Sequence, residues 1–75
     1  MAGKKQQLPW QVRTNTAILA DCWTADIAAA VAALNYGHTW ITYHGETVWD
    51  SKDNPVMDRN VIAAIATRKG YGSGA

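Results

Sequence analysis

Apolar and polar residues alternate between Trp40 and Trp49, and a His44-Gly45 dipeptide interrupts the run at its middle. Alternation with a period of two is typical of a strand with one buried face, and glycine accepts the positive φ of a tight turn. The pattern therefore predicts a β-hairpin. With a two-residue turn, one face carries the pairs Tyr43–Glu46 and Ile41–Val48, and the other carries Thr42–Thr47 and Trp40–Trp49.

A helical pattern follows toward the C-terminus. Asn54 can cap this helix, Pro55 suits its first position, and Asp58 lies near the positive end of the helix dipole. Gly70 is a natural stop after the basic pair Arg68-Lys69. Apolar residues at helical spacing predict the buried stripe: Met57, Val61, Ile62 and Ile65.

The first third of the chain permits two interpretations. One long helix over about residues 16–36 gives a continuous apolar face, but that face contains Asp26 at its middle; its members are Leu19, Cys22, Trp23, Ile27, Ala30, Val31 and Leu34. In the other interpretation Thr24 caps a shorter helix that ends at Gly37, and Asp26 falls in its first turn. Residues 11–20 then form a strand that places Val12, Thr14, Thr16 and Ile18 on one side.

The second interpretation is favoured because an isolated hairpin is marginal in water and a third strand removes one of its open edges. We therefore predict an α+β fold of order β-α-β-β-α, with the helices on one face of a short antiparallel or mixed sheet. The alternative is helix-hairpin-helix. We expect one domain over residues 8–70, with flexible termini at residues 1–7 and 71–75.

Charge is unevenly distributed along the chain. The two ends carry five bases, whereas residues 14–67 carry two bases against six acids. The basic ends are candidate nucleic-acid contacts, and their residues are Lys4, Lys5, Arg13, Arg68 and Lys69. The acidic body instead disfavours phosphate. A single cysteine and the lack of a long apolar run lead us to expect a cytoplasmic protein without disulfides.

The sequence offers no pattern of catalytic or metal-binding residues. The segment from Asp50 to Pro55 lacks the glycine and distal glutamate of a calcium loop. His38 and His44 flank a predicted strand, and Cys22 has no orienting base at a fixed spacing. We therefore expect a non-enzymatic protein with no cofactor and no metal ion.

Two surfaces are candidates for binding a protein partner. The first is the hairpin face that bears Trp40, Thr42, Thr47 and Trp49, because paired exposed indoles are strong anchors, unless the two tryptophans belong to the core. The second is an exposed strand edge, which could pair with a second copy to form a homodimer. The outward positions of the helix over residues 24–34 are expected to be mostly alanine with Asp26, so base reading by that helix is disfavoured.

Element order and size also suggest a resemblance. The order β-α-β-β with an acidic body is similar to that of several small phage anti-defence proteins, including some anti-CRISPRs, and helix-hairpin-helix resembles small phage head–tail joining proteins. The resemblance implies a phage or mobile-element accessory protein of the inhibitor type. Accessory nucleic-acid binding and virion or complex assembly are the alternative functions.

Overall fold

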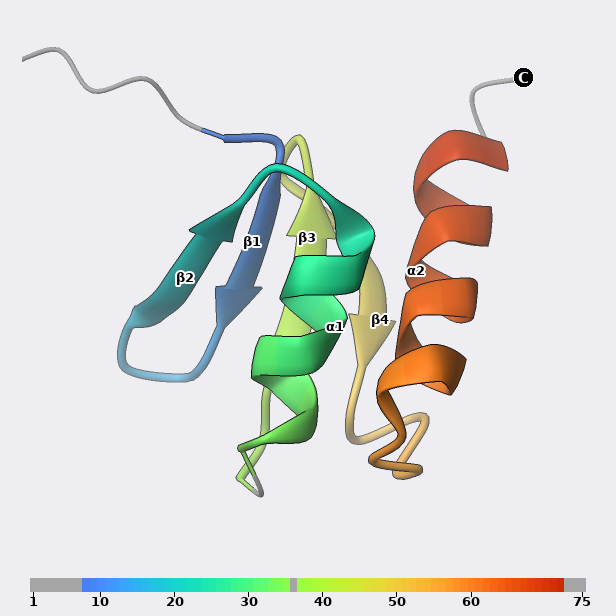
Figure 1. Cartoon of the computed structure of the whole chain (residues 1–75). Helices are drawn as coiled ribbons and strands as arrows, with labels where there is room; N and C mark the ends of the chain where they lie inside the picture. The colour runs from blue at the N-terminus through green and yellow to red at the C-terminus, as the bar shows by residue number, and fades with distance from the viewer. Residues whose placement is uncertain (1–7, 36, 73–75) are drawn as a thin grey trace, which may run out of the picture.

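Four antiparallel strands and two helices make up the fold (Figure 1). The structure is a computed structural model that describes residues 8–35 and 37–72. The strands are β1 (Trp10–Arg13), β2 (Ile18–Cys22), β3 (Trp40–Tyr43) and β4 (Glu46–Asp50), and the helices are α1 (Ala25–Ala33) and α2 (Arg59–Gly72). The sheet order is β2-β1-β3-β4. The predicted α+β class is confirmed, whereas helix-hairpin-helix is wrong.

The predicted N-terminal strand is in fact a hairpin, so the order is ββαββα. The hydroxyl of Thr14 accepts hydrogen bonds from the backbone N–H groups of Thr16 and Ala17, at 3.3 and 3.1 Å. The Thr14 N–H donates to the carbonyl of Ala17 at 2.8 Å and closes the turn. Threonine and asparagine favour such local bonds, and here they interrupt the alternation that suggested one continuous strand.

Helix α1 begins where the split interpretation places it. The Thr24 hydroxyl accepts a hydrogen bond from the N–H of Ile27 at 3.3 Å, and Asp26 lies in the first turn. The helix ends at Ala33, before the predicted stop at Gly37, with Leu34 as its C-cap. The Asn35 side chain donates to the Val31 carbonyl at 2.7 Å and satisfies one of the last carbonyl groups.

The second hairpin starts in the predicted register and then departs from it. His44 and Gly45 both have positive φ, and Tyr43–Glu46 and Thr42–Thr47 pair as expected. A bulge then inserts Val48, so that Ile41 lies opposite Trp49, and Trp40 lies opposite Asp50. The predicted pairs Ile41–Val48 and Trp40–Trp49 are therefore wrong. A bulge breaks the two-residue alternation, and Val48 and Trp49 are consecutively buried.

Helix α2 starts later and ends later than predicted. Asp58 caps it by accepting hydrogen bonds from the N–H groups of Asn60 and Val61, at 2.8 and 3.3 Å. Asn54 is not the cap; its backbone N–H donates to the Asp50 carbonyl at 3.0 Å, in the turn after β4. Of the predicted stripe, Ile62 is buried, Met57 and Ile65 are half-buried against the core, and Val61 is exposed. Ala63 and Ala66 complete the buried side of the helix.

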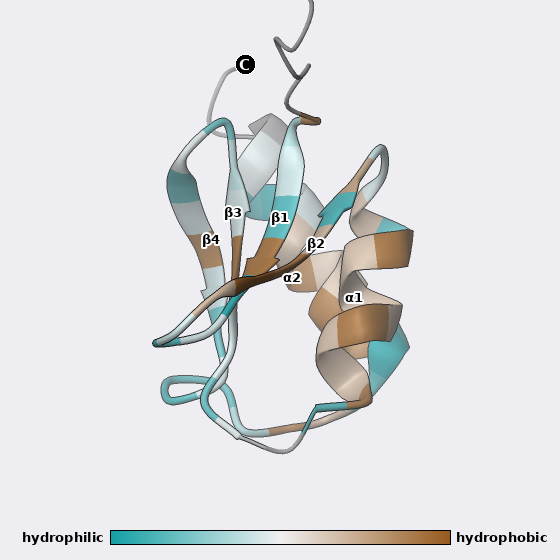
Figure 2. Cartoon of the chain, turned by 90° about the vertical axis from the view of Figure 1, so that its left-hand side faces the viewer, coloured by the Kyte–Doolittle hydropathy of each residue, from teal (hydrophilic) through white to brown (hydrophobic). Residues whose placement is uncertain are grey.

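Both helices cover the same face of the sheet. α1 lies against β1, β2 and β3, and α2 lies against α1 and β4 (Figures 1 and 2). The core between these layers combines large side chains from the strands with small ones from the helices. The strand members are Trp10, Val12, Cys22, Ile41, Val48 and Trp49, and the helix members are Ala25, Ala28, Ala29, Ala32, Ile62, Ala63 and Ala66.

The closest approach in this core is between Trp10 and Gly70. The indole of Trp10 is fully buried and stacks on Tyr43, with ring centroids 4.3 Å apart. A Cβ at Gly70 would lie 2.7 Å from Cη2 of Trp10 and 3.4 Å from Tyr43. α2 continues through Gly70, so the prediction that this glycine ends the helix is wrong. Glycine is required at this position because a larger residue would overlap the indole of Trp10.

Gly70→Ala is expected to destabilise the protein by about 1–2 kcal/mol, because the overlap with Trp10 outweighs the gain of roughly 1 kcal/mol in helix propensity. Urea denaturation monitored by circular dichroism measures the change. Gly37→Ala is the matched control, since nothing lies within 4 Å of a Cβ at Gly37, and its effect should stay within about 0.5 kcal/mol. A more stable Gly70→Ala variant would contradict the proposed contact.

Candidate interaction surface

The open face of the sheet carries only part of the predicted partner-binding set. Trp40, Thr42 and Thr47 lie on this face, but Thr42 is only 3% exposed, so its prediction as a contact residue is wrong. Trp40 is half-buried beside His38, with ring centroids 4.9 Å apart. Trp49 is 2% exposed and belongs to the core on the helix side. The predicted pair of exposed indoles is therefore wrong, because the bulge at Val48 turns Trp49 toward the helices.

A shallow depression of about 590 Å³ lies at one end of the open face. Its polar side chains bind one another: Gln11 donates to Asp21 at 2.7 Å, and Arg13 donates to Gln11 at 3.3 Å. The depression is lined by Leu8, Pro9, Gln11, Arg13, Ile18, His44 and Gly45. These hydrogen bonds fix the positions of Gln11 and Arg13, although the guanidinium of Arg13 has four further N–H donors.

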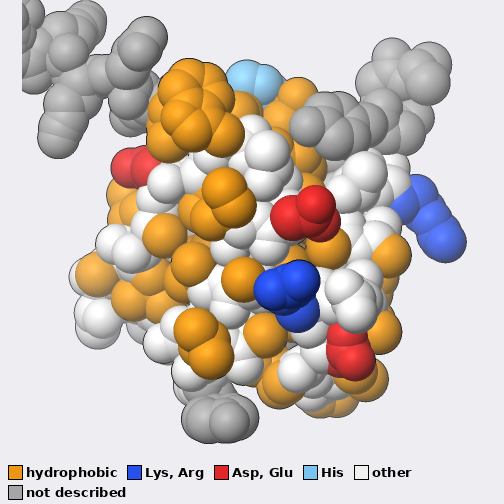
Figure 3. All heavy atoms as spheres, in the orientation of Figure 1, with side chains coloured by type: hydrophobic (Ala, Val, Ile, Leu, Met, Phe, Trp, Pro, Cys, Tyr) orange, Lys and Arg blue, Asp and Glu red, His pale blue; other side chains and the backbone are white. Residues whose placement is uncertain are grey.

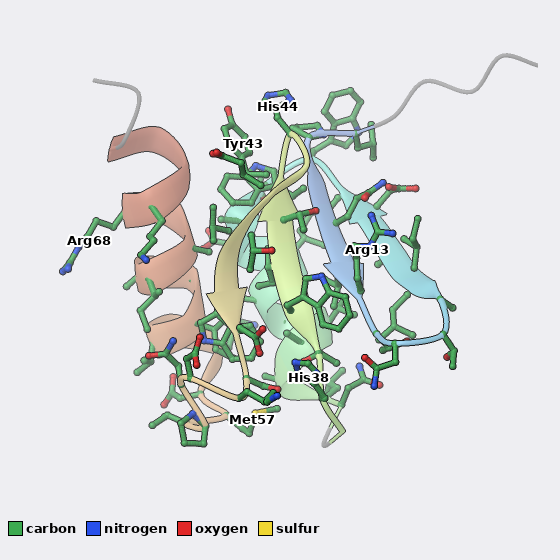
Figure 4. The ribbon with its side chains drawn as sticks, turned by 180° about the vertical axis from the view of Figure 1, so that it is seen from behind. Arg13, His38, Tyr43, His44, Met57 and Arg68 are labelled. Carbon is green, nitrogen blue, oxygen red and sulfur yellow. The ribbon has the colours of Figure 1, made fainter. Side chains whose placement is uncertain are left out.

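The predicted nucleic-acid contacts do not gather in one place. Figure 4 shows Arg13 on β1 and Arg68 pointing away from the far side of α2. Lys69 follows Arg68 in the last turn of α2 and borders a small pocket beside β4. Lys4 and Lys5 lie outside the described residues. The described bases of this set therefore form no continuous track for a phosphate backbone.

The closest charged contact links the base of the second hairpin to the preceding loop. His38 Nε2 and Asp50 Oδ1 are 2.8 Å apart, and the same oxygen accepts a hydrogen bond from the N–H of Lys52 at 2.9 Å. Partial burial acts to raise the pKa of Asp50. The hydrogen bonds from Lys52 and His38, together with their charges, outweigh that effect and lower its pKa. This cluster is explained by turn stabilisation.

The remaining reactive side chains among the described residues are the thiol of Cys22 and two imidazoles. Burial, and secondarily the charge of Asp21, raise the pKa of the Cys22 thiol, which disfavours the nucleophilic thiolate. His38 and His44 lie at opposite ends of β3 (Figure 4). Within residues 8–35 and 37–72, no three histidine, cysteine or carboxylate side chains are grouped to hold a metal ion. No helix in the same ranges is long and apolar enough to cross a bilayer.

The outer side of α1 is the surface that the sequence interpretation missed. The helix buries four alanines against the sheet and α2, and it turns Ile27 and Leu34 away from them, while Val31 is half-buried against the core. Ile27 is 51% exposed and Leu34 is 78% exposed, and Trp23, immediately before the helix cap, is 65% exposed. The prediction of mostly alanine at the outward positions is therefore wrong.

These exposed residues recur at helical spacing. We call Trp23, Ile27, Val31 and Leu34 the α1 stripe, with Val31 being half-buried. Ile27, Val31 and Leu34 lie on one side of α1 because they are separated by four and three residues, and Trp23 precedes the helix cap at its N-terminal end. Figure 3 shows hydrophobic side chains spread over the front of α1, with few charged side chains among them. This spacing is visible in the sequence, but it predicts a buried helix face because large apolar residues usually face the core.

The α1 stripe is more apolar than the open face of the sheet. Asp26 is the only charged residue within the helix, and every other residue from Ala25 to Ala33 is apolar. A groove between α1 and α2 adjoins Asp26 and is bordered by Asn60, Ala63, Ala64, Thr67 and Arg68. The α1 stripe can therefore bind only by burial of apolar surface, with a polar margin on the side of α2.

The two tryptophans of the second hairpin should respond differently to substitution. Trp49→Ser should lower the free energy of unfolding by about 3–5 kcal/mol, because it removes a fully packed indole from the core. Trp40→Ser should cost about 1–2 kcal/mol, since Trp40 is only half-buried. Urea denaturation of the two variants in parallel measures the difference. Equal losses would contradict the different burial of the two indoles.

Asp50→Asn should remove part of the pH dependence of stability. The folded state lowers the pKa of Asp50. Ionised Asp50 therefore contributes to the free energy of unfolding at pH values above its unfolded-state pKa of ~3.9, and this contribution is lost as the pH falls through its lower folded-state pKa. The variant should lose about 1 kcal/mol at pH 7 and less at pH 3, as measured by urea denaturation. Asp53→Asn, an exposed carboxylate in the same turn, is the control. An equal loss at both pH values would refute the ionic contribution.

Comparison of the chain with models of known protein families, with curated proteins and with solved structures gave no match.

Proposed function

We propose that this protein is a small non-enzymatic protein-interaction domain, and that the α1 stripe is the surface through which it contacts another polypeptide chain. The observation that carries the proposal is the orientation of α1, which faces alanines inward and Trp23, Ile27 and Leu34 outward. Large apolar residues clustered at helical spacing on a surface mark interaction sites in soluble proteins.

The composition of α1 supports the same conclusion. A helix that is hydrophobic on all sides is normally enclosed by other elements, whereas a surface helix has a polar outer face. The ribbon of α1 in Figure 2 is coloured toward the hydrophobic end of the scale along most of its length. The described part of the chain covers only the inner side of this helix, so a second chain is the natural cover for its outer side.

The distribution of reactive groups supports a binding role over a catalytic one. The thiol of Cys22 is buried, and the His38–Asp50 pair is occupied by its structural contacts. The setting we propose is that of a phage or mobile-element accessory protein that acts by occupying or bridging a protein surface. The observed order ββαββα differs from both orders on which that resemblance was based, so the α1 stripe carries the proposal.

Site-specific photo-crosslinking tests whether the α1 stripe makes the contact. The full chain carries p-benzoyl-phenylalanine in place of Ile27, or in place of Val56 as a control, and is irradiated in an extract of the cells that express it. Val56 is a suitable control because it is 55% exposed and lies outside α1. We expect an adduct of discrete mass from position 27 and none from position 56.

A second substitution within the stripe establishes that the adduct reflects a specific site. The position-27 chain that also carries Leu34→Gln should give much less adduct, whereas the position-27 chain that also carries Val61→Gln should give an unchanged yield. Equal labelling from positions 27 and 56, or no adduct from position 27, would be evidence against the proposed function.

A further inference from the structure

We propose that the chain covering the α1 stripe is a second copy of this protein, so that the domain forms a two-fold dimer through α1. This inference rests on the proposed function, because it names the partner of the same surface. In a two-fold interface the same patch serves both subunits, and the residues of one stripe pack against those of the other.

The lack of charge on the stripe is compatible with an identical partner. A partner selected by charge would require a strongly acidic or basic margin, but Asp26 is the only charged residue of α1, and the stripe itself is uncharged. The formal net charge of the full chain is +1, so two copies experience little mutual repulsion. An uncharged apolar stripe is complemented by another uncharged apolar stripe.

The dimensions of the stripe also suit self-association. From Ile27 to Leu34 it extends over roughly 10 Å at 1.5 Å per residue, with Trp23 beyond the helix cap, and an identical stripe matches that length. Ala30 lies between the larger members on the outward side, and a small residue at such a position lets two helix axes approach to about 8–10 Å.

The buried area sets the expected strength of the dimer. The exposed parts of Trp23, Ile27 and Leu34 provide on the order of 400 Å² of apolar surface, about half of what each partner contributes to a standard interface. An interface of this size is at the low end for specific complexes and fits a weak, reversible association instead of a permanent dimer. A chain this short also has reason to associate, because a small core leaves its stability marginal.

Sedimentation velocity of the purified full chain, from about 5 to 500 μM, tests the inference. We expect the mass to rise from 8.2 kDa to twice that value with increasing concentration. Ile27→Gln/Leu34→Gln should raise the apparent dissociation constant at least thirtyfold. Val56→Gln/Val61→Gln replaces two exposed aliphatic residues outside α1 and should leave it unchanged.

Circular dichroism and a thermal melt accompany each variant. If the double variant unfolds, Leu34→Gln alone takes its place, because Leu34 is 78% exposed at the helix end and its replacement leaves the core intact. That variant should then raise the dissociation constant at least fivefold. A dimer that resists both α1 variants would overturn the inference.

The remaining outcomes separate the inference from the proposed function. A strict monomer at 500 μM whose position-27 crosslink goes to a different polypeptide would overturn the dimer and leave the interaction surface in place. A strict monomer with no position-27 crosslink would overturn both.

Discussion

The packing of this domain depends on a division of volume between its two layers. The sheet contributes the indoles of Trp10 and Trp49, both almost fully buried, and the chain contains no phenylalanine. Protein interiors are close-packed, so side chains that face such large groups must be small. The helices meet this requirement with six buried alanines and the glycine of α2: Ala25, Ala28, Ala29, Ala32, Ala63, Ala66 and Gly70.

This division explains why α1 has an apolar outer side. Its inward positions are filled by alanine because Trp10, Ile41 and Trp49 already occupy the core. The larger aliphatic residues of the same helix then have no space beneath it and face outward. The exposure of Ile27 and Leu34 is therefore a consequence of how the core is packed, and the proposed interaction surface and the core have one physical origin.

Local chemistry was predictable from the sequence where one residue determines it. The cap at Thr24 and the turn at His44-Gly45 depend on a hydroxyl acceptor and on positive φ, and both are where the sequence placed them. The bulge at Val48 and the continuation of α2 through Gly70 were not predictable in this way. Both depend on contacts between residues distant in sequence, such as the approach of α2 to Trp10.

The candidate site was missed because hydrophobicity alone does not determine which side of α1 is buried. Since the helix is apolar on nearly all sides, a pattern of apolar and polar positions contains little information about its orientation. Side-chain size contains that information, because alanines at positions 25, 28, 29 and 32 form one face and larger residues form the opposite face. When a sheet contributes several tryptophans, the face of small residues should be assigned to the core. The opposite apolar face is then a candidate surface for a second polypeptide chain.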